Sequence, residues 1–128
     1  MKLFEIIKAR MTVAMLYREK IAGKLAYKFL KFLSATETDE RFYREKLQEI
    51  IEKYGEKDEK GNFIETETGI QIQKEYRDDC HKAIVELEST EVDKPSLSIT
   101  YDELEDIKIS TEGMTSLFAF IEEKKGEK

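Results

Sequence analysis

Apolar residues in the first third of the chain recur three or four positions apart, which is the spacing of an amphipathic helix. One apolar stripe spans residues 3–17 and a second spans residues 21–33, so we expect helix from residue 3 to about residue 33. Gly23 interrupts the pattern, and glycine inside a helix costs ~1 kcal/mol relative to alanine. The sequence therefore predicts two helices or one bent helix, with the break near residues 20–23.

A further helix is expected over residues 39–54, after a polar turn in which Thr36 or Thr38 can act as the N-cap. Gly55 follows directly, at a position where helices favour a left-handed residue. Because the connecting turn is short, we expect residues 1–55 to form an antiparallel helical hairpin. The apolar side of the later helix consists of Tyr43, Leu47, Ile50, Ile51 and Tyr54.

The apolar pattern changes after this hairpin. Alternating apolar and polar residues predict a short β-hairpin with strands near residues 62–66 and 69–73. Helical spacing returns over residues 74–89. Pro95 then bars a helix interior, so we expect residues 92–99 to be extended.

Two capping signals mark short helices near the C-terminus. Thr100 followed by Glu103 matches a capping box and predicts a helical turn that begins at Tyr101. After a brief strand over residues 107–109, Ser110 is placed to cap a last helix. The expected buried stripe of that helix is Met114, Leu117, Phe118 and Ile121.

These elements predict one α+β domain over residues 1–128 that is mainly helical. An antiparallel helical hairpin forms its first half. Residues 56–123 supply a small β-hairpin or sheet, a helix, a short strand and a C-terminal helix. Residues 124–128 are expected to fray.

Charge is distributed unevenly along the chain, whose net charge is -6 and whose charged fraction is 39%. Residues 1–33 hold eight basic and only two acidic side chains. Four of these basic residues, Lys20, Lys24, Lys28 and Lys31, recur on one helix face. We favour pairing of this stripe with the acidic residues of the next helix, which can select register although exposed pairs contribute little. The alternatives are contact with an acidic protein or, less favoured, with nucleic acid.

No pattern in the chain predicts catalysis, a cofactor or a metal site. His81 and Asp78 lie one turn apart, but no nucleophile signature accompanies them. The consecutive residues Asp78 to His81 point around a helix and cannot converge on one ion. A calcium loop fails at Lys60 and Gly61, which occupy the wrong positions. We therefore expect a protein that is not an enzyme and has no small-molecule substrate.

The cellular compartment is indicated by the cysteine content and by the lack of a secretory signal or membrane span in the sequence. The single cysteine, Cys80, excludes an internal disulfide and fits a reducing compartment. Glu5, Lys8 and Arg10 interrupt the apolar residues near the N-terminus, so no secretory signal is expected. No apolar run approaches the ~20 residues of a membrane span. These features favour the cytoplasm.

Apolar residues occur on more than one side of the first helix, including Phe4, Ile7, Met11 and Met15. They are candidates for binding a protein partner or a second copy of the chain, which would make a homodimer. The alternative is that one monomeric core absorbs them. Together with Lys20, Lys24, Lys28 and Lys31 they form the candidate partner-binding set.

Several segments resemble a family of small phage and prophage proteins of unknown function. The resemblance rests on residues 24–31 (KLAYKFLK), 44–46 (REK), 53–62 (KYGEKDEKGN) and 107–110 (IKIS), the last leading into an amphipathic helix. It implies a phage-encoded protein that works inside a bacterial host, and it carries over no catalytic residues. We expect a non-enzymatic protein-interaction module that acts in virion assembly or associates with the virion. The alternative is a regulator of host function that binds protein or nucleic acid through its basic N-terminal helix.

Overall fold

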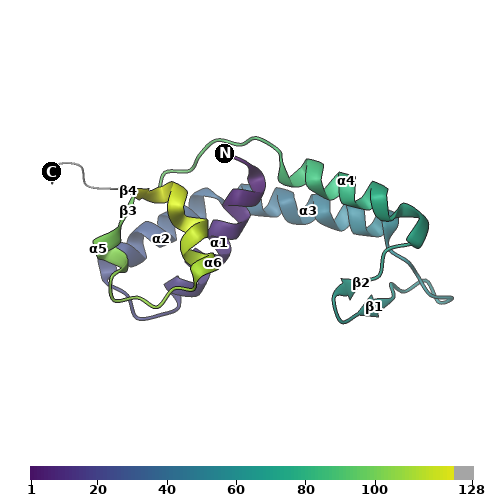
Figure 1. The fold of residues 1–128 in the computed structure, drawn as a ribbon, viewed down its shortest axis with the longest axis horizontal. Coiled ribbons are helices and arrows are strands. Elements are labelled where there is room, and N and C mark those ends of the chain that lie inside the picture. The colour runs from purple at the N-terminus through teal and green to yellow at the C-terminus, as the bar shows by residue number, and fades with distance from the viewer. Residues whose placement is uncertain (123–128) are drawn as a thin grey trace.

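The computed structural model describes residues 1–122, which form an elongated molecule with two parts (Figure 1). We call residues 1–36 and 93–122 the head, and residues 37–92 the arm. The arm leaves the head along the long axis and carries a small hairpin at its far end (Figure 1). The expected fraying of residues 124–128 lies outside the described residues.

The head is built from both ends of the described chain. Its elements are α1 (Leu3–Tyr17), α2 (Gly23–Ala35), β3 (Ile99–Thr100), α5 (Tyr101–Leu104), α6 (Thr111–Leu117), the 3-10 helix η2 (Phe118–Phe120) and β4 (Ile121–Glu122). Strands β3 and β4 pair in parallel, with Ile99 opposite Ile121. The break that Gly23 predicts is confirmed, since α1 ends at Tyr17 and α2 begins at Gly23.

The arm consists of two antiparallel helices and the hairpin (Figure 1). Its elements are α3 (Glu37–Tyr54), β1 (Glu65–Thr66), β2 (Gly69–Ile70), the 3-10 helix η1 (Lys74–Tyr76) and α4 (Arg77–Glu88). Strands β1 and β2 pair antiparallel. The mainly helical α+β class is therefore confirmed. No helix within residues 1–122 combines the length and the apolar character that crossing a bilayer requires.

The main hydrophobic core lies in the head. It consists of Ala9, Val13, Leu16, Leu25, Phe29, Phe32, Ile99, Leu104, Leu117 and Phe120. Phe32 and Phe120 meet edge to face, with ring centroids 5.3 Å apart. A smaller cluster of Leu3, Ile7 and Leu87 joins α1 to the base of the arm, flanked by the half-buried Tyr43, Leu47, Ile50 and Val92.

A hydrogen-bonded bend at Thr36 sets the direction of the arm. The Thr36 side chain is fully buried, and its hydroxyl donates to the Phe32 carbonyl oxygen at 2.7 Å. Arg10 Nη1 donates to Thr36 Oγ1 at 2.6 Å and to the Leu33 carbonyl oxygen at 2.7 Å. Glu40 lies 3.8 Å from the same guanidinium. Because the Thr36 hydroxyl bonds backwards into α2, it does not cap α3 as predicted.

The prediction that the helix over residues 39–54 packs antiparallel to the helix before it is wrong. Helix α3 continues away from α2 after the bend and packs antiparallel to α4 instead (Figure 1). The predicted short connection between α2 and α3 is confirmed, since only Thr36 separates the two helices. A connection of one residue does not by itself make the second helix run back along the first. The buried contacts of Arg10 with Thr36 and Leu33 hold the two helices in different directions.

The tip of the arm agrees with the predicted β-hairpin in place but has shorter strands than 62–66 and 69–73. Gly61 has a φ of +86°, as its place in the turn predicts. The predicted left-handed conformation of Gly55 is wrong, because its φ of -68° and ψ of 144° are those of extended backbone. A side chain there would come within 2.8 Å of the Phe63 ring, so close packing requires this glycine.

The two capping predictions near the C-terminus are confirmed. Glu103 N–H donates to Thr100 Oγ1, and Glu103 Oε1 accepts from Thr100 N–H at 3.0 Å, which completes the capping box. Ser110 Oγ accepts from Gly113 N–H at 3.0 Å and caps α6. The predicted strand over residues 107–109 is wrong, since that segment is irregular and the pairing partner of β3 is β4.

Candidate functional site

Four side chains form a stripe along the solvent face of α1, which we call the α1 seam. It consists of Phe4, Lys8, Met11 and Met15. Met11 is 68% exposed and Met15 is 60% exposed, whereas Phe4 is 36% exposed. Lys8 Nζ lies 5.4 Å from the centroid of the Phe4 ring, a distance typical of a cation–π contact. The seam therefore leaves two large apolar side chains mostly in water while the opposite face of α1 is buried.

The structure separates Ile7 from the other three apolar candidates of α1. Ile7 is only 9% exposed and packs with Leu3 and Leu87 at the base of the arm. Apolar residues occur on more than one side of α1 because the head core covers one side and the arm covers another. Ile7 is thus a core residue, and Phe4, Met11 and Met15 remain accessible.

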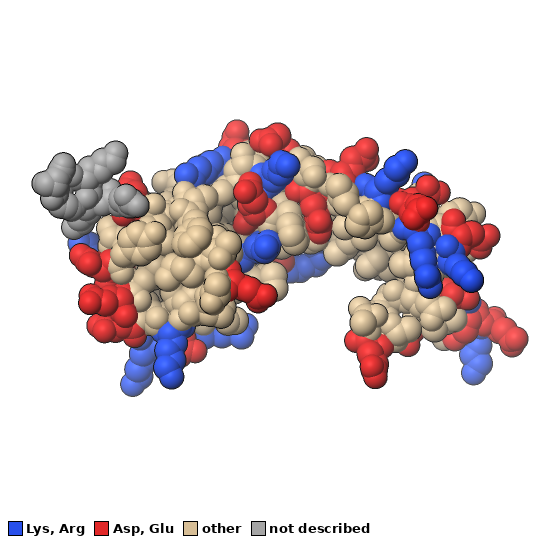
Figure 2. Space-filling model, viewed as in Figure 1, with Lys and Arg blue, Asp and Glu red and all other residues tan. Residues whose placement is uncertain are grey.

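Uncharged residues predominate on a broad face of the head, whereas charged side chains crowd the arm (Figure 2). Helix α6 packs against α1 on this face, and Thr12 Oγ1 lies 2.8 Å from Ser116 Oγ. The exposed uncharged residues that α6 and η2 contribute are Thr111, Thr115, Phe118 and Ala119.

Phe118 is a functional candidate that the sequence pattern missed. It was expected in the buried stripe, but it is 56% exposed. The α-helix ends at Leu117, and the chain continues as a 3-10 turn, whose tighter period places the next side chains on different faces. Phe120 takes the buried position instead. No local signal in the sequence marks this change of period.

The lysine stripe is divided by the structure. Lys28 Nζ donates to both Glu103 carboxylate oxygens at 3.0 Å and to the Ser98 carbonyl oxygen at 2.8 Å. Lys20, Lys24 and Lys31 are exposed and form no ion pair within residues 1–122. Lys31 Nζ lies 5.7 Å from the Tyr27 ring centroid.

The favoured pairing of this stripe with the acidic residues of the next helix is wrong. Helix α3 runs away from α2 (Figure 1), and none of its carboxylates forms an ion pair with an α2 lysine within residues 1–122. They pair within their own helix, as in Glu37 with Arg41 and Glu40 with Arg44, or with Arg10 of α1. Lys28 is the lysine of the stripe that does form an ion pair, and its partner, Glu103, lies 75 positions later in the chain.

The Glu103 carboxylate is bonded to Lys28, and its pKa is lowered. Burial raises the pKa of its carboxyl, but hydrogen bonds from the Thr100 N–H and from Lys28 outweigh this effect and hold the pKa below its usual value. The charged carboxylate is therefore favoured in the folded state, where it caps α5 and binds α2.

Cys80 and His81 are residues of the arm that the sequence offered as candidates for chemistry. Cys80 is 4% exposed, and burial raises the pKa of its thiol, which disfavours the nucleophilic thiolate. His81 is exposed, and no hydrogen bond joins it to Asp78 in the described chain. Residues 1–122 contain no group of three or more His, Cys, Asp or Glu side chains that could hold a metal ion.

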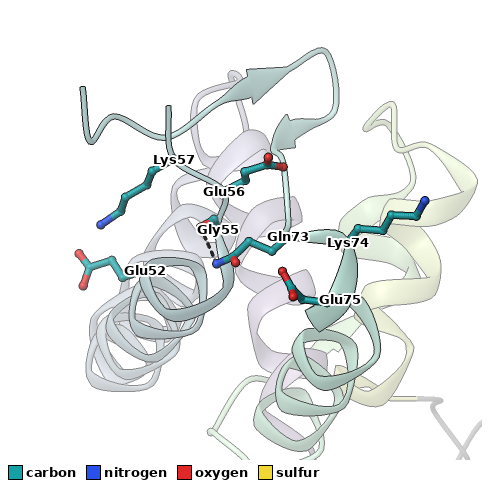
Figure 3. A pocket seen from close by; sticks show the side chains of 7 residues that line it. All are labelled: Glu52, Gly55, Glu56, Lys57, Gln73, Lys74 and Glu75. Carbon is teal, nitrogen blue, oxygen red and sulfur yellow. Dashed lines mark hydrogen bonds between the residues drawn. The ribbon is translucent and has the colours of Figure 1, made fainter. Parts of the chain in front are cut away.

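An open cleft of about 590 Å³ lies where α3 ends and η1 begins (Figure 3). Gln73 Nε2 donates to the Gly55 carbonyl oxygen at 3.3 Å across it. Its other lining residues mix both signs of charge and are Glu52, Glu56, Lys57, Lys74 and Glu75. Ligand pockets are mostly apolar with a few polar groups, so this cleft lacks their usual character.

Comparison with known proteins found no matching family model, no matching curated protein and no matching solved structure.

Proposed function

We propose that the protein is a non-enzymatic protein–protein interaction module encoded by a phage or prophage, which acts in virion assembly in the cytoplasm of its bacterial host. The single observation that carries the interaction is the α1 seam, in which Met11 and Met15 are 68% and 60% exposed. The phage origin rests on the resemblance of residues 24–31, 44–46, 53–62 and 107–110.

Exposed apolar side chains on α1, together with a head face poor in charge (Figure 2), favour a protein-binding role. Charged residues make up 39% of the chain, yet few lie on the head face that Figure 2 shows. Contiguous apolar surface mostly marks an interaction site, and methionine is enriched in interface cores because its flexible side chain adapts to a partner. The remaining charged surface keeps the free protein in solution.

A photo-crosslinking amino acid placed at Met11 in phage-producing cells tests this function. We expect Met11 to capture one defined phage-encoded protein, because the seam excludes water only when a partner covers it. Val85 is the matched control, since it is apolar, 44% exposed and lies on the arm. The same products at both positions, or none at Met11, would contradict the proposal.

The second candidate is a regulator of host function that binds an acidic surface through α2. It is supported by the exposed Lys20, Lys24 and Lys31, which have no ion pair within residues 1–122. A triple change of these lysines to glutamate should abolish salt-sensitive binding to host protein or nucleic acid. Lys28→Met is unsuitable for this test because Lys28 supports α5. Binding that survives the triple change would exclude this candidate.

A further inference from the structure

The α1 seam has the spacing of a coiled-coil contact. Phe4, Lys8, Met11 and Met15 are separated by four, three and four residues, and Arg18 follows three residues later. Alternating intervals of three and four place side chains along one line that faces another helix, where each packs between residues of that helix. Here the line faces solvent, because no element of the described chain covers it.

We propose that the α1 seam is covered by the α1 seam of a second copy of this chain, with the two helices antiparallel; this rests on the proposed function and names its partner. In such a pair, a two-fold axis passes between residues 9 and 10. Phe4 then packs against Met15 of the second copy, and Lys8 packs against Met11 of the second copy. Each of the four seam residues finds a counterpart, and the two-fold axis repeats every contact.

The position of Lys8 distinguishes the antiparallel pair from a parallel one. In a parallel pair, the two Lys8 side chains would share one layer and their charges would repel each other. In the antiparallel pair, the Lys8 stem lies along Met11 of the second copy, and its ammonium reaches the solvated edge. A single lysine in such a seam selects register and orientation at a cost in affinity.

Charges at the ends of α1 complement each other in the antiparallel pair. Arg18 follows α1 and forms no ion pair within residues 1–122. At the other end, Glu5 is exposed, and Glu91, whose backbone forms a β-bridge with the exposed Lys2, has a side chain that is 73% exposed and accepts a hydrogen bond from the Met1 ammonium at 3.2 Å. The antiparallel pair brings Arg18 of one copy to these two carboxylates of the other, once at each end.

The size of this contact predicts a weak and reversible dimer. The four layers span about 16 Å of helix, given a rise of about 1.5 Å per residue. Stable dimers commonly bury about 800 Å² on each partner, which is more than one short helix supplies. We therefore expect a dissociation constant on the order of tens of micromolar.

Sedimentation velocity of the full chain over a micromolar concentration series tests the pair. Met11→Lys should weaken the dimer about tenfold or more, because it sets a second ammonium opposite Lys8 of the other copy. Met11→Glu should keep the dimer and make it more salt-sensitive, because its carboxylate faces that same Lys8. Lys8→Met should tighten the dimer about tenfold by removing the charged layer. Val85→Lys on the arm is the control and should change nothing.

The outcomes separate this inference from the proposed function. A monomeric wild-type chain, or equal loss of the dimer in Met11→Lys and Met11→Glu, would overturn the antiparallel pair. If Met11 still captured a different phage protein in cells, the proposed function would stand without self-association. Because Met11 is 68% exposed, these variants should fold, and an unchanged thermal melt followed by circular dichroism verifies it.

Discussion

The head and the arm are both helical, but they differ in how much apolar surface each buries. The head holds ten buried residues in one cluster, drawn from α1, α2 and the segment after residue 98. In the arm, α3 has no buried residue over residues 37–54. The smaller cluster has three buried members, and two of them, Leu3 and Ile7, belong to α1. The arm is therefore an extension whose core is partly supplied by the head, and four predictions test this difference.

The largest effect is expected in the head core. Phe32→Ala should lower the free energy of unfolding by about 4 kcal/mol, because Phe32 is fully buried and contacts Phe120. Leu87→Ala, at the base of the arm, should cost about 2 kcal/mol because its surroundings are partly exposed and can relax. Phe118→Ala is the exposed control on the head, with an expected change within about 0.5 kcal/mol. Denaturant unfolding measures all three, and equal losses at Phe32 and Leu87 would remove the distinction between head and arm.

The second-largest effect is expected at the bend between the head and the arm, where Arg10 bonds to Thr36. Arg10→Met should cost about 2 kcal/mol, because it leaves the buried Thr36 hydroxyl and the Leu33 carbonyl oxygen without a donor. Arg41→Met is the matched control, since Arg41 pairs with Glu37 on the exposed side of α3 and should cost below about 0.5 kcal/mol. Denaturant unfolding compares the two variants. A loss at Arg41 as large as that at Arg10 would show that the buried bend does not hold the arm.

The Lys28–Glu103 pair adds a pH dependence to the head. Because the folded state lowers the pKa of Glu103, the stability that this carboxylate contributes is complete above its unfolded pKa of about 4.3. That stability is lost as the pH falls through the lower pKa of the folded state. Lys28→Met should cost about 1 kcal/mol at neutral pH and lose less stability than wild type on acidification. Unfolding curves from pH 7 to pH 3 test this, and parallel losses in the two proteins would contradict it.

The smallest effects are expected at two glycines. Gly61→Ala should cost about 1 kcal/mol at the arm tip, because its φ of +86° strains a side chain. Gly23→Ala should stabilise the head by about 0.5 kcal/mol, because Gly23 begins α2 with ordinary φ and open space around it. Amide hydrogen exchange should show that Gly61→Ala loosens only the arm tip. Loosening of α2 by that change would mean that the two parts unfold as one unit.

The candidate surface was predictable in part. Phe4, Met11 and Met15 were recognised as apolar residues beyond the needs of one helix face, and they are exposed. Ile7 belonged to the same set but is buried, because the arm packs on its side of α1. Periodicity locates the faces of a helix but does not say which other elements cover them.

Short-range features of the fold were determined by the sequence alone. The break before Gly23, the capping box at Thr100, the N-cap at Ser110 and the turn at Gly61 depend on hydrogen bonds and steric limits within about four residues. Such signals are present in the local chain whatever the rest of the molecule does.

The directions and partners of the elements were decided only by the tertiary structure. Helix α3 packs against α4, and Arg10 bonds to Thr36, 26 positions away, at the bend between α2 and α3. Lys28 pairs with Glu103 across 75 positions, and β3 pairs with the distant β4. These contacts join segments whose proximity depends on burying the whole head core, which no local pattern specifies.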